Sequence, residues 1–310
     1  MINELIKQIF KSNNLGDLQT IEKIEIGFSN KIYSIDDKYI LKICGDLENE
    51  PYIAKEVFLF NFFENIIPVP KVIAYDNTKS ICDSHYLIYH KIQGDNLYSV
   101  WHLMNNEERR DIVKQLCNIL KKINNASCDE FVNKFKIDKN IDWQDIIISK
   151  IKKSLKEVSN KKLIPSDFIQ AINNFVENNK HVLKEQKIAL TYYDAHFDNV
   201  LVKDNKIVGL LDLERTELFS IDYALDIIQR MVDIPHKYMS EESEKYCKPE
   251  DYMNLLHWFK EFYPELFGFK NMDKRLALYG VEHDLRDLIH FPEIDNIKKT
   301  IANFIDYNIG

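Results

Sequence analysis

Short runs of β-branched and aromatic residues, separated by polar turns, dominate the first third of the chain and predict β-strands. The predicted strands are residues 20–26, 31–35, 39–44, 71–75 and 85–92. A short amphipathic helix over residues 5–10 precedes them. Pro51 suits the first turn of a helix, so a second helix is predicted from there to about Glu64. These elements predict a small, mostly antiparallel sheet with one inserted helix.

The apolar residues after Gly94 recur mostly at helical spacing. In residues 107–124, for example, Ile112, Leu116 and Ile123 fall on one face. The other helices are predicted over residues 141–155, 166–183 and from about 221 to the end. Three predicted strands interrupt these helices, at residues 188–193, 199–203 and 206–213. The expected fold class is therefore α+β, with an N-terminal domain of residues 1–93 and a C-terminal domain of residues 94–310.

The composition is that of an ordinary globular protein, with 45% hydrophobic and 29% charged residues among 310. The net charge of −8 disfavours a nucleic-acid partner. Much of the acidic excess lies in residues 190–310, which hold 23 acidic and 14 basic side chains. No apolar run could span a membrane, and the first ten residues lack the apolar core of a signal peptide, so we expect a cytoplasmic protein. The scattered cysteines argue against a disulfide framework or a zinc site; they are Cys44, Cys82, Cys117, Cys128 and Cys247.

The strongest chemical signal lies between the predicted strands of residues 188–213. Asp194 ends one strand, Asn199 begins the next, and Asp204-Asn205 suits a two-residue hairpin turn. Pairing across that turn sets Asn199 opposite about Leu210, so Asp212 lies near the loop from Asp194 to Asn199. Hard oxygen ligands that converge in this way suit Mg²⁺, which leaves positions for phosphate and water.

These residues resemble the catalytic core of the aminoglycoside phosphotransferase and choline kinase-like family. Residues 192–199 and 211–214 resemble the family patterns H-G-D-x-H-x-x-N and I-D-[FW]-E, and residues 222–226 resemble D-P-x-x-D. The resemblance implies a bilobal protein-kinase-like fold, with a small antiparallel-sheet lobe and a larger, mostly helical lobe. It also implies that Asp194 is the catalytic base and that Asn199 and Asp212 bind Mg²⁺. Asp222 and Asp226 would support the core.

A kinase fold also needs a strand lysine for the nucleotide phosphates and a helix carboxylate to orient it. Lys42 lies on a predicted strand between apolar neighbours, although such a lysine could also face solvent at a sheet edge. Glu56 follows on the predicted helix, on the apolar side near Phe60 and Phe63. A carboxylate on that side is costly unless it is paired, so an ion pair between Lys42 and Glu56 is expected.

The resemblance implies two further contacts with a bound nucleotide. The turn that contains Gly27, Ser29 and Asn30 corresponds to the loop that covers the phosphates, although Ser29 and Asn30 could also serve the turn alone. The backbone of the hinge would read the nucleobase, and the hinge residues are Tyr89, His90, Lys91 and Ile92.

The chain departs from the family pattern at two positions, where Tyr192 and Tyr193 replace His and Gly. The side chain of Tyr193 could restrict backbone conformations that Gly permits. His196 is expected to be a hydrogen-bonded scaffold residue, and Glu214 is either a helix-start residue or a second metal contact. Structural interpretations are favoured for the other residues. Residues 241–244 are expected to begin a solvated helix, although they could contact a cationic ligand, and Trp258 and Tyr263 are expected in the core, although they could line a substrate cleft.

The expected function is a Mg²⁺-dependent kinase that transfers the γ-phosphoryl group of ATP or GTP to a hydroxyl of a small molecule. The acidic C-terminal part favours a cationic acceptor, with an aminoglycoside-like antibiotic as the leading candidate. Choline, methylthioribose, homoserine or a macrolide are alternatives. A nucleotide-binding pseudokinase scaffold is an alternative from another class, and a protein kinase is disfavoured because no A-P-E signature is present. The oligomeric state is left open.

Overall fold

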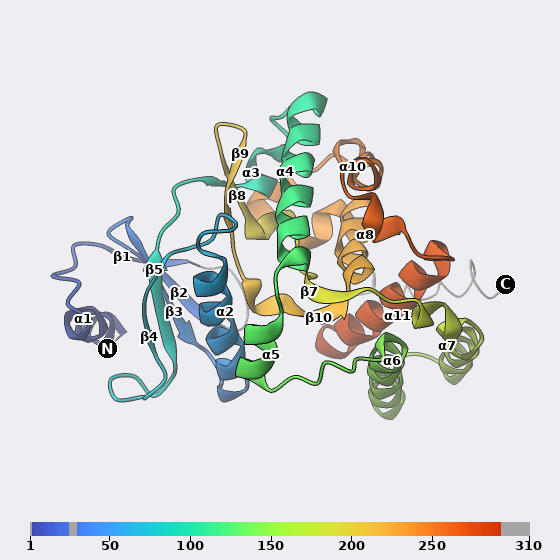
Figure 1. Ribbon diagram of the computed structural model, residues 1–310. Coiled ribbons are helices and arrows are strands. Elements are labelled where there is room, and N and C mark those ends of the chain that lie inside the picture. Colours follow the sequence, from blue (N-terminus) through green and yellow to red (C-terminus); the bar gives the residue numbers. More distant parts are fainter. Residues whose placement is uncertain (1, 25–29, 293–310) are drawn as a thin grey trace. The chain divides into compact units, whose positions relative to one another are not determined.

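The computed structural model describes residues 2–24 and 30–292, and these residues form two compact units (Figure 1). The first unit comprises Met1–Lys122, Asp194–Thr216 and Ile234–Asn254. The second comprises Ile123–Tyr193, Glu217–Asp233 and Leu255–Gly310. Segments on both sides of Gly94 therefore group with the N-terminal sheet, and the lobe boundary near Gly94 stays a prediction.

The first unit contains a five-stranded antiparallel sheet in the order β1-β2-β3-β5-β4. Its strands are β1 (Ile21–Ile24), β2 (Asn30–Ile35), β3 (Tyr39–Cys44), β4 (Val72–Asp76) and β5 (Tyr86–His90). The strands lie where the runs of β-branched and aromatic residues predict them, and apolar side chains on one face, such as Tyr33, Leu41 and Ile88, are buried. The predicted residues 25 and 26 of the first strand lie outside the described part of the chain.

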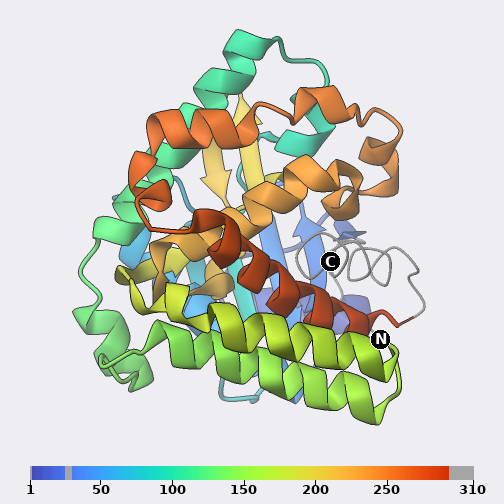
Figure 2. The ribbon, with the colours of Figure 1, turned by 90° about the vertical axis from the view of Figure 1, so that its right-hand side faces the viewer.

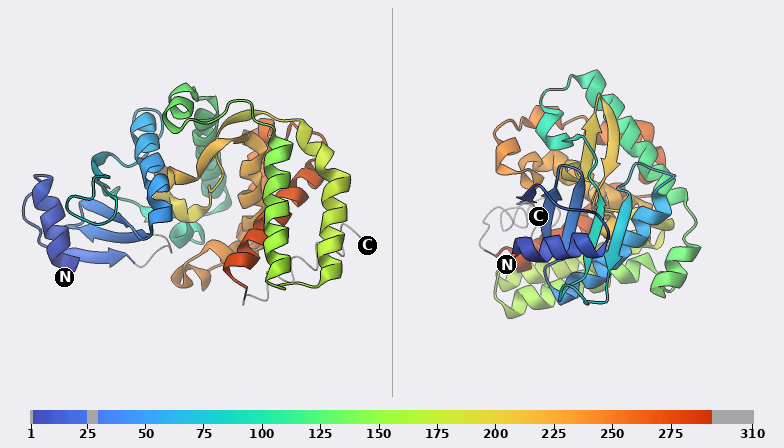
Figure 3. Two further views of the ribbon diagram at one scale, coloured as in Figure 1. Left: turned by 90° about the horizontal axis from the view of Figure 1, so that it is seen from below. Right: turned by 90° about the vertical axis from the view of Figure 1, so that its left-hand side faces the viewer.

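Helix α1 (Ile2–Ser12) lies across one face of this sheet (Figure 3, right). Its buried side chains form one apolar cluster with Leu41 and Ile43 of β3. Ile40 and Lys42 point to the opposite face, because successive side chains of a strand alternate. Helix α2 (Glu50–Phe63) packs on that side, and Pro51 lies in its first turn as predicted.

A second, three-stranded sheet in the first unit has the order β6-β8-β9. Its strands are β6 (Asp95–Asn96), β8 (Val200–Lys203) and β9 (Lys206–Leu210). Asp204 and Asn205 form the predicted hairpin turn, and both have positive φ angles, of 50° and 56°. These angles favour Asn and Asp, and they match the twist of the hairpin.

The hairpin register differs by one residue from the predicted one. Lys203 pairs with Lys206 as expected, but a bulge between Leu201 and Val202 shifts the pairs farther from the turn, and Val200 lies opposite Leu210. Asn199 consequently lies opposite Leu211, whose N–H donates to its carbonyl. The strand predicted to reach residue 213 ends at Leu210, because Asp212 adopts a left-handed conformation.

The remaining helices of the first unit are α3 (Leu97–Trp101), most of α4 (Asn106–Asn125) and α9 (Glu241–Glu244). A helix begins at the acidic residues 241–244, as predicted, and the Ser240 side chain is the N-cap of this helix, α9. Within the described residues, no helix has both the length and the apolar character needed to cross a membrane.

The second unit is mostly helical. Its helices are α5 (Asp129–Phe135), α6 (Trp143–Asn160), α7 (Ser166–Asn179), α8 (Leu225–Asp233), α10 (Leu255–Phe262) and α11 (Met272–His290). Helices α6, α7 and α11 lie side by side around one apolar core (Figure 2). Strand β7 (Ile188–Tyr192) pairs with β10 (Thr216–Ser220). The sequence pattern predicts β7 but no strand at the position of β10. Trp258 and Tyr263 are buried, as predicted.

Buried ion pairs in the second unit engage several of the acidic residues. Asp222 is fully buried and accepts hydrogen bonds from Arg275 at 2.7 and 3.0 Å. Asp226 contacts Arg230 at 3.4 Å and His283 at 2.6 Å. The carboxylates of the D-P-x-x-D-like segment therefore hold helices of this unit together.

Candidate active site

The ammonium group of Lys42 faces three carboxylates within the first unit. Its Nζ atom lies 2.8 Å from Glu56, 3.0 Å from Asp212 and 3.2 Å from Glu214. The predicted ion pair between Lys42 and Glu56 is confirmed, and both side chains are almost fully buried. Glu214 belongs to the same cluster, although the sequence alone left its role open.

Local sequence explains how these four residues meet. Lys42 is fixed by the register of β3, and Glu56 lies one turn before Phe60 on the buried side of α2. Asp212 takes a left-handed φ of 50° directly after β9, and the 3₁₀ turn Leu213–Arg215 follows it. This turn brings Glu214 toward α2, where it meets the same ammonium group.

The cluster has two negative charges in excess, because one ammonium group faces three carboxylates. Burial alone would lower the pKa of Lys42, but Asp212, Glu56 and Glu214 outweigh it and hold the pKa well above its usual value. Burial has the opposite effect on Glu56, whose pKa it raises, and the negative charges of Asp212 and Glu214 raise that pKa further. For Asp212, burial acts in the same direction, but Lys42 keeps its pKa below the usual range.

The loop after β7 carries the predicted catalytic base and the first predicted metal ligand. The Nδ2 atom of Asn199 donates to the carbonyl oxygen of Asp194 at 2.9 Å and lies 3.2 Å from Nε2 of His196. His196 lies 3.7 Å from the Asp194 carboxylate. These contacts close the loop, as expected for His196, and leave the Oδ1 atom of Asn199 for another partner.

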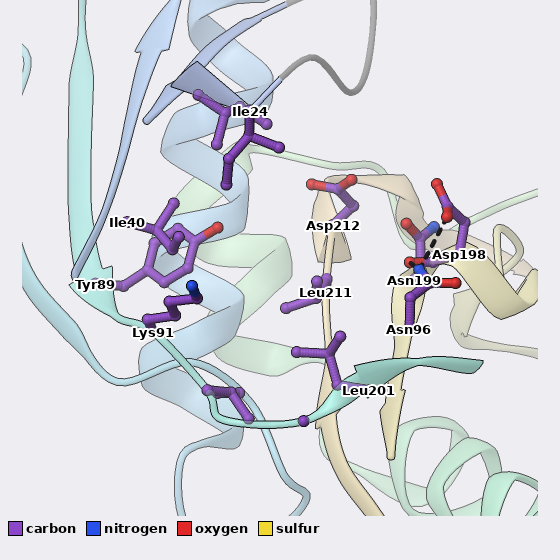
Figure 4. Close-up of a pocket in the computed structure, with 13 residues that line it drawn as sticks. Ile24, Ile40, Tyr89, Lys91, Asn96, Asp198, Asn199, Leu201, Leu211 and Asp212 are labelled. Carbon is purple, nitrogen blue, oxygen red and sulfur yellow. Dashed lines mark hydrogen bonds between the residues drawn. The ribbon is translucent and has the colours of Figure 1, made fainter. Parts of the chain in front are cut away.

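A cavity of about 280 Å³ borders these groups within the first unit (Figure 4). Ile24, Ile32 and Ile40 of the five-stranded sheet line it, together with Leu201 and Leu211 near the hairpin. Asn199 and Asp212 lie at its polar end, and Tyr89 lies on the side of the sheet. The cavity is therefore a mostly apolar slot that ends at oxygen-bearing side chains.

The structure brings together most of the predicted nucleotide-binding residues. Tyr89, Lys91 and Ile92 line the cavity, whereas the side chain of His90 packs against the Tyr39 ring. The backbone N–H of His90 donates to Lys71 and that of Lys91 to Lys38, so these two N–H groups are already used.

The phosphate-covering turn is only partly described. Gly27 and Ser29 lie outside the described residues. Asn30 is the first residue of β2 and lies opposite Cys44 in the sheet.

Two polar residues of the cavity were not singled out from the sequence. The side chain of Asn96 donates to the Oδ1 atom of Asp198 at 2.9 Å and to its carbonyl oxygen at 2.7 Å. Burial raises the pKa of Asp198, and His196 and Asn96 oppose that effect. The position of Asp198 beside Asn199 was a usable signal, but nothing local connects it to Asn96, which is 102 residues away.

The departures at Tyr192 and Tyr193 have structural explanations. Tyr192 is fully buried in β7. Tyr193 has no positive φ angle, so its backbone does not require Gly. Its ring packs against Phe219 and Tyr223, with centroid distances of 5.3 and 5.4 Å. Tyr193 therefore packs against the apolar core of the second unit.

A buried lysine–glutamate pair beside an apolar slot, with Asp and Asn on the adjoining loop, defines a phosphoryl-transfer enzyme of the protein-kinase-like class. The family model APH, described as the phosphotransferase enzyme family, matches residues 20–222, and the chain belongs to this family. The chain is thus an enzyme that transfers phosphate to a hydroxyl group, and its predicted α+β, kinase-like fold class is confirmed.

Solved structures with the same fold include three aminoglycoside phosphotransferases. The streptomycin–ATP complex of APH(2'')-IIa has a TM-score of 0.71 and 15% identity, covering 99% of this chain and 96% of that one. ADP-bound APH(2'')-Ib has a TM-score of 0.70 and 16% identity, covering 98% and 97%. The GDP and kanamycin complex of APH(2'')-IIIa has a TM-score of 0.70 and 12% identity, covering 99% and 98%. A search of the curated protein sequences finds no match.

Proposed function

We propose that this enzyme is a Mg²⁺-dependent kinase that transfers the γ-phosphoryl group of ATP or GTP to a hydroxyl of a small cationic molecule. The observation that carries the proposal is the cluster of Lys42 with Glu56, Asp212 and Glu214 at the edge of an apolar cavity. An aminoglycoside-like antibiotic is the leading acceptor. The solved relatives named above bind ATP, ADP or GDP, and two of them bind streptomycin or kanamycin.

The cavity suits the donor nucleotide. Aliphatic side chains such as Ile40 and Leu211 would enclose a flat purine, and the hinge backbone at Tyr89–Ile92 would contact its edge through groups other than the N–H of His90 and Lys91. Lys42 would bind the phosphates, with Glu56 holding its ammonium group in place. The turn that contains Gly27, Ser29 and Asn30 is the proposed phosphate cover.

The same cluster fits a magnesium ion. Glu56, Asp212 and Glu214 each present one carboxylate oxygen within 4.8 Å of the others, and the excess negative charge suits a divalent cation. We assign Asp212 and the Oδ1 atom of Asn199 as the ligands, because both residues line the cavity, whereas Glu56 lies outside its lining. A bound Mg²⁺ would neutralise charge on the transferring phosphate.

Asp194 is the proposed catalytic base. Its carboxylate is partly exposed, and its loop is fixed by Asn199. Asp194 would orient the acceptor hydroxyl and take its proton, while the hydroxyl oxygen forms a bond to the γ-phosphorus. The bond from that phosphorus to the bridging oxygen breaks, and the nucleoside diphosphate leaves with the bonding electrons. Positioning and charge stabilisation by Lys42 supply the remaining rate enhancement.

The cationic acceptor is proposed from charge. Residues 190–310 hold 23 acidic and 14 basic side chains. Buried pairs engage some of these carboxylates, including Asp222 and Asp226. Others, such as Glu242, Glu244 and Glu250, are exposed. The excess of negative charge in these residues would attract an acceptor with several amino groups. We also propose that the enzyme acts in the cytoplasm, where its nucleotide donors are abundant.

A nucleotide-consumption screen tests this proposal. The purified chain is supplied with ATP or GTP and with aminoglycosides, macrolides, choline, methylthioribose or homoserine. We expect Mg²⁺-dependent release of ADP or GDP with an aminoglycoside, and mass spectrometry should show one added phosphoryl group on it. Asp194→Asn should lower turnover at least about 100-fold and leave nucleotide affinity within about twofold.

Asp204→Asn serves as the matched control, because it makes the same substitution in the turn between β8 and β9, outside the cavity. Unchanged turnover in Asp194→Asn would disprove the assigned base. Tight nucleotide binding without turnover of any acceptor would instead favour a pseudokinase scaffold.

A further inference from the structure

Asp198 and Asn96 form a hydrogen-bonded pair in the wall of the cavity (Figure 4). Asp198 precedes the proposed metal ligand Asn199, at a position that the family pattern leaves open. Figure 4 shows both residues on the side of the cavity opposite Tyr89 and Ile40. The proposed chemistry assigns Asp198 no role, although this residue lines the cavity.

Asn96 is held firmly by its own contacts. It pairs with Leu201 of β8, and its Oδ1 atom caps α3 by accepting from the N–H of Tyr98 at 3.0 Å. Its amide NH₂ group therefore points in a fixed direction and donates to Asp198 twice, at the carbonyl oxygen and at Oδ1. The Asp198 side chain is thereby oriented, and Oδ2 is the oxygen left for a ligand.

The chemistry of a nucleotide limits what this oxygen can contact. A carboxylate accepts hydrogen bonds and repels phosphate, so it needs a donor group on the ligand. A nucleotide carries such donors on its sugar hydroxyls and on the nucleobase. The proposed base contacts lie at Tyr89–Ile92 and the phosphate contacts at Lys42. The sugar joins these two parts and is the donor-bearing part that remains for Asp198.

We infer that Asp198, oriented by Asn96, accepts hydrogen bonds from the sugar hydroxyls of the donor nucleotide and thereby selects ribonucleotides over deoxyribonucleotides. The inference rests on the proposed function, because it takes the cavity as the nucleotide site. A hydrogen bond to a charged group contributes enough to change affinity about tenfold.

Isothermal titration calorimetry with ADP, 2′-deoxy-ADP and 3′-deoxy-ADP tests the inference in the presence of Mg²⁺ and without an acceptor. The wild-type enzyme should bind ADP about tenfold more tightly than at least one of the two deoxy analogues. In Asp198→Ala, ADP should bind as weakly as that analogue, whose own affinity should change less than about twofold. General damage to the site would weaken all three ligands equally.

Two further variants keep the test decisive. Asn96→Asp retains a good N-cap for α3 but replaces the NH₂ donor with an oxygen that repels Asp198, so it should also reduce the discrimination. Asp204→Ala, a loss of the same side chain in the turn of the hairpin, should leave discrimination unchanged. Circular dichroism and a thermal melt would establish that each variant folds.

The possible failures are distinguishable. If neither ADP nor GDP binds, the proposed nucleotide site is wrong, and the inference falls with it. If ADP and both deoxy analogues bind the wild-type enzyme alike, the nucleotide site stands and the role of Asp198 is overturned. The same holds if Asp198→Ala retains the full discrimination, or if it changes the Mg²⁺ requirement and leaves discrimination intact.

Discussion

The Nζ atom of Lys42 lies 2.8 Å from the Oε2 atom of Glu56, and both side chains are almost fully buried. The pair is not symmetrical, because Lys42 has two more carboxylate partners, whereas Lys42 is the one cation paired with Glu56 among the residues that the structure describes. Removing the lysine would leave a buried carboxylate without its counter-charge. Removing the charge of Glu56 would leave Lys42 with Asp212 and Glu214.

Lys42→Met should therefore cost more stability than Glu56→Gln. We expect Lys42→Met to lower the free energy of unfolding by about 3 kcal/mol, and Glu56→Gln by about 1 kcal/mol. The double variant should lose less than the sum, because a neutral glutamine needs no counter-charge. Urea unfolding of the four proteins measures this cycle. Equal costs for the two single variants would contradict the asymmetry.

The metal requirement should depend on Asp212 and Asn199. Chelation with EDTA should stop phosphoryl transfer, and added Mg²⁺ should restore it. Asp212→Asn and Asn199→Ala should each raise the half-saturating Mg²⁺ concentration about tenfold or more, because each removes a hard oxygen ligand. Binding of Mn²⁺, followed by electron paramagnetic resonance, gives a readout that is independent of turnover. An unchanged metal affinity in both variants would show that these residues are not ligands.

Gly94 lies in the wall of the cavity, where there is no space for a side chain. A Cβ atom at this position would lie 2.8 Å from Cγ2 of Val208 and 3.0 Å from the carbonyl oxygen of Val202. We expect Gly94→Ala to lower the free energy of unfolding by about 1–3 kcal/mol and to weaken nucleotide binding, because the wall must shift.

Gly268→Ala is the matched control, because the nearest atom to a Cβ there lies at 3.4 Å. It should change stability by less than about 1 kcal/mol and leave nucleotide binding unchanged. Differential scanning fluorimetry with and without ADP compares the two variants. Equal effects would argue against the steric explanation.

The second unit should lose stability at acidic pH through Asp226. Burial would raise the pKa of Asp226, but Arg230 and His283 outweigh it and hold the pKa well below its usual range. The stabilisation that Asp226 contributes to the folded state is therefore complete above the unfolded-state pKa of about 4, and it is lost as the pH falls further.

Asp226→Asn should lower the free energy of unfolding at pH 7 by about 3 kcal/mol and flatten its dependence on pH below about 4. Asp167→Asn, at an exposed position of α7, should leave the curve unchanged. Urea unfolding between about pH 2 and 7 provides the measurement. If the free energy of unfolding of Asp226→Asn still falls at acidic pH as it does in the wild-type protein, groups other than Asp226 cause the loss of stability.

The local parts of the fold could be predicted because their signals are local. A run of β-branched and aromatic residues placed β3, and Pro51 marked the start of α2. The adjacent residues Asp204 and Asn205 identified the hairpin turn. The bulge between Leu201 and Val202 was not predictable, because it depends on which strand pairs with the hairpin and on side-chain packing around it.

By itself, the sequence determined the ion pair of Lys42 and Glu56 and the ordering of Asp194, Asn199 and Asp212 along the chain. A buried carboxylate needs a partner, and helical periodicity placed Glu56 on the apolar side of its helix, although the face of Lys42 was left open. Only the tertiary structure decided that Glu214 joins Lys42 and that Asn96 orients Asp198. The residues of these pairs are 172 and 102 positions apart. Their contacts depend on how sheets and turns pack, which no local pattern encodes.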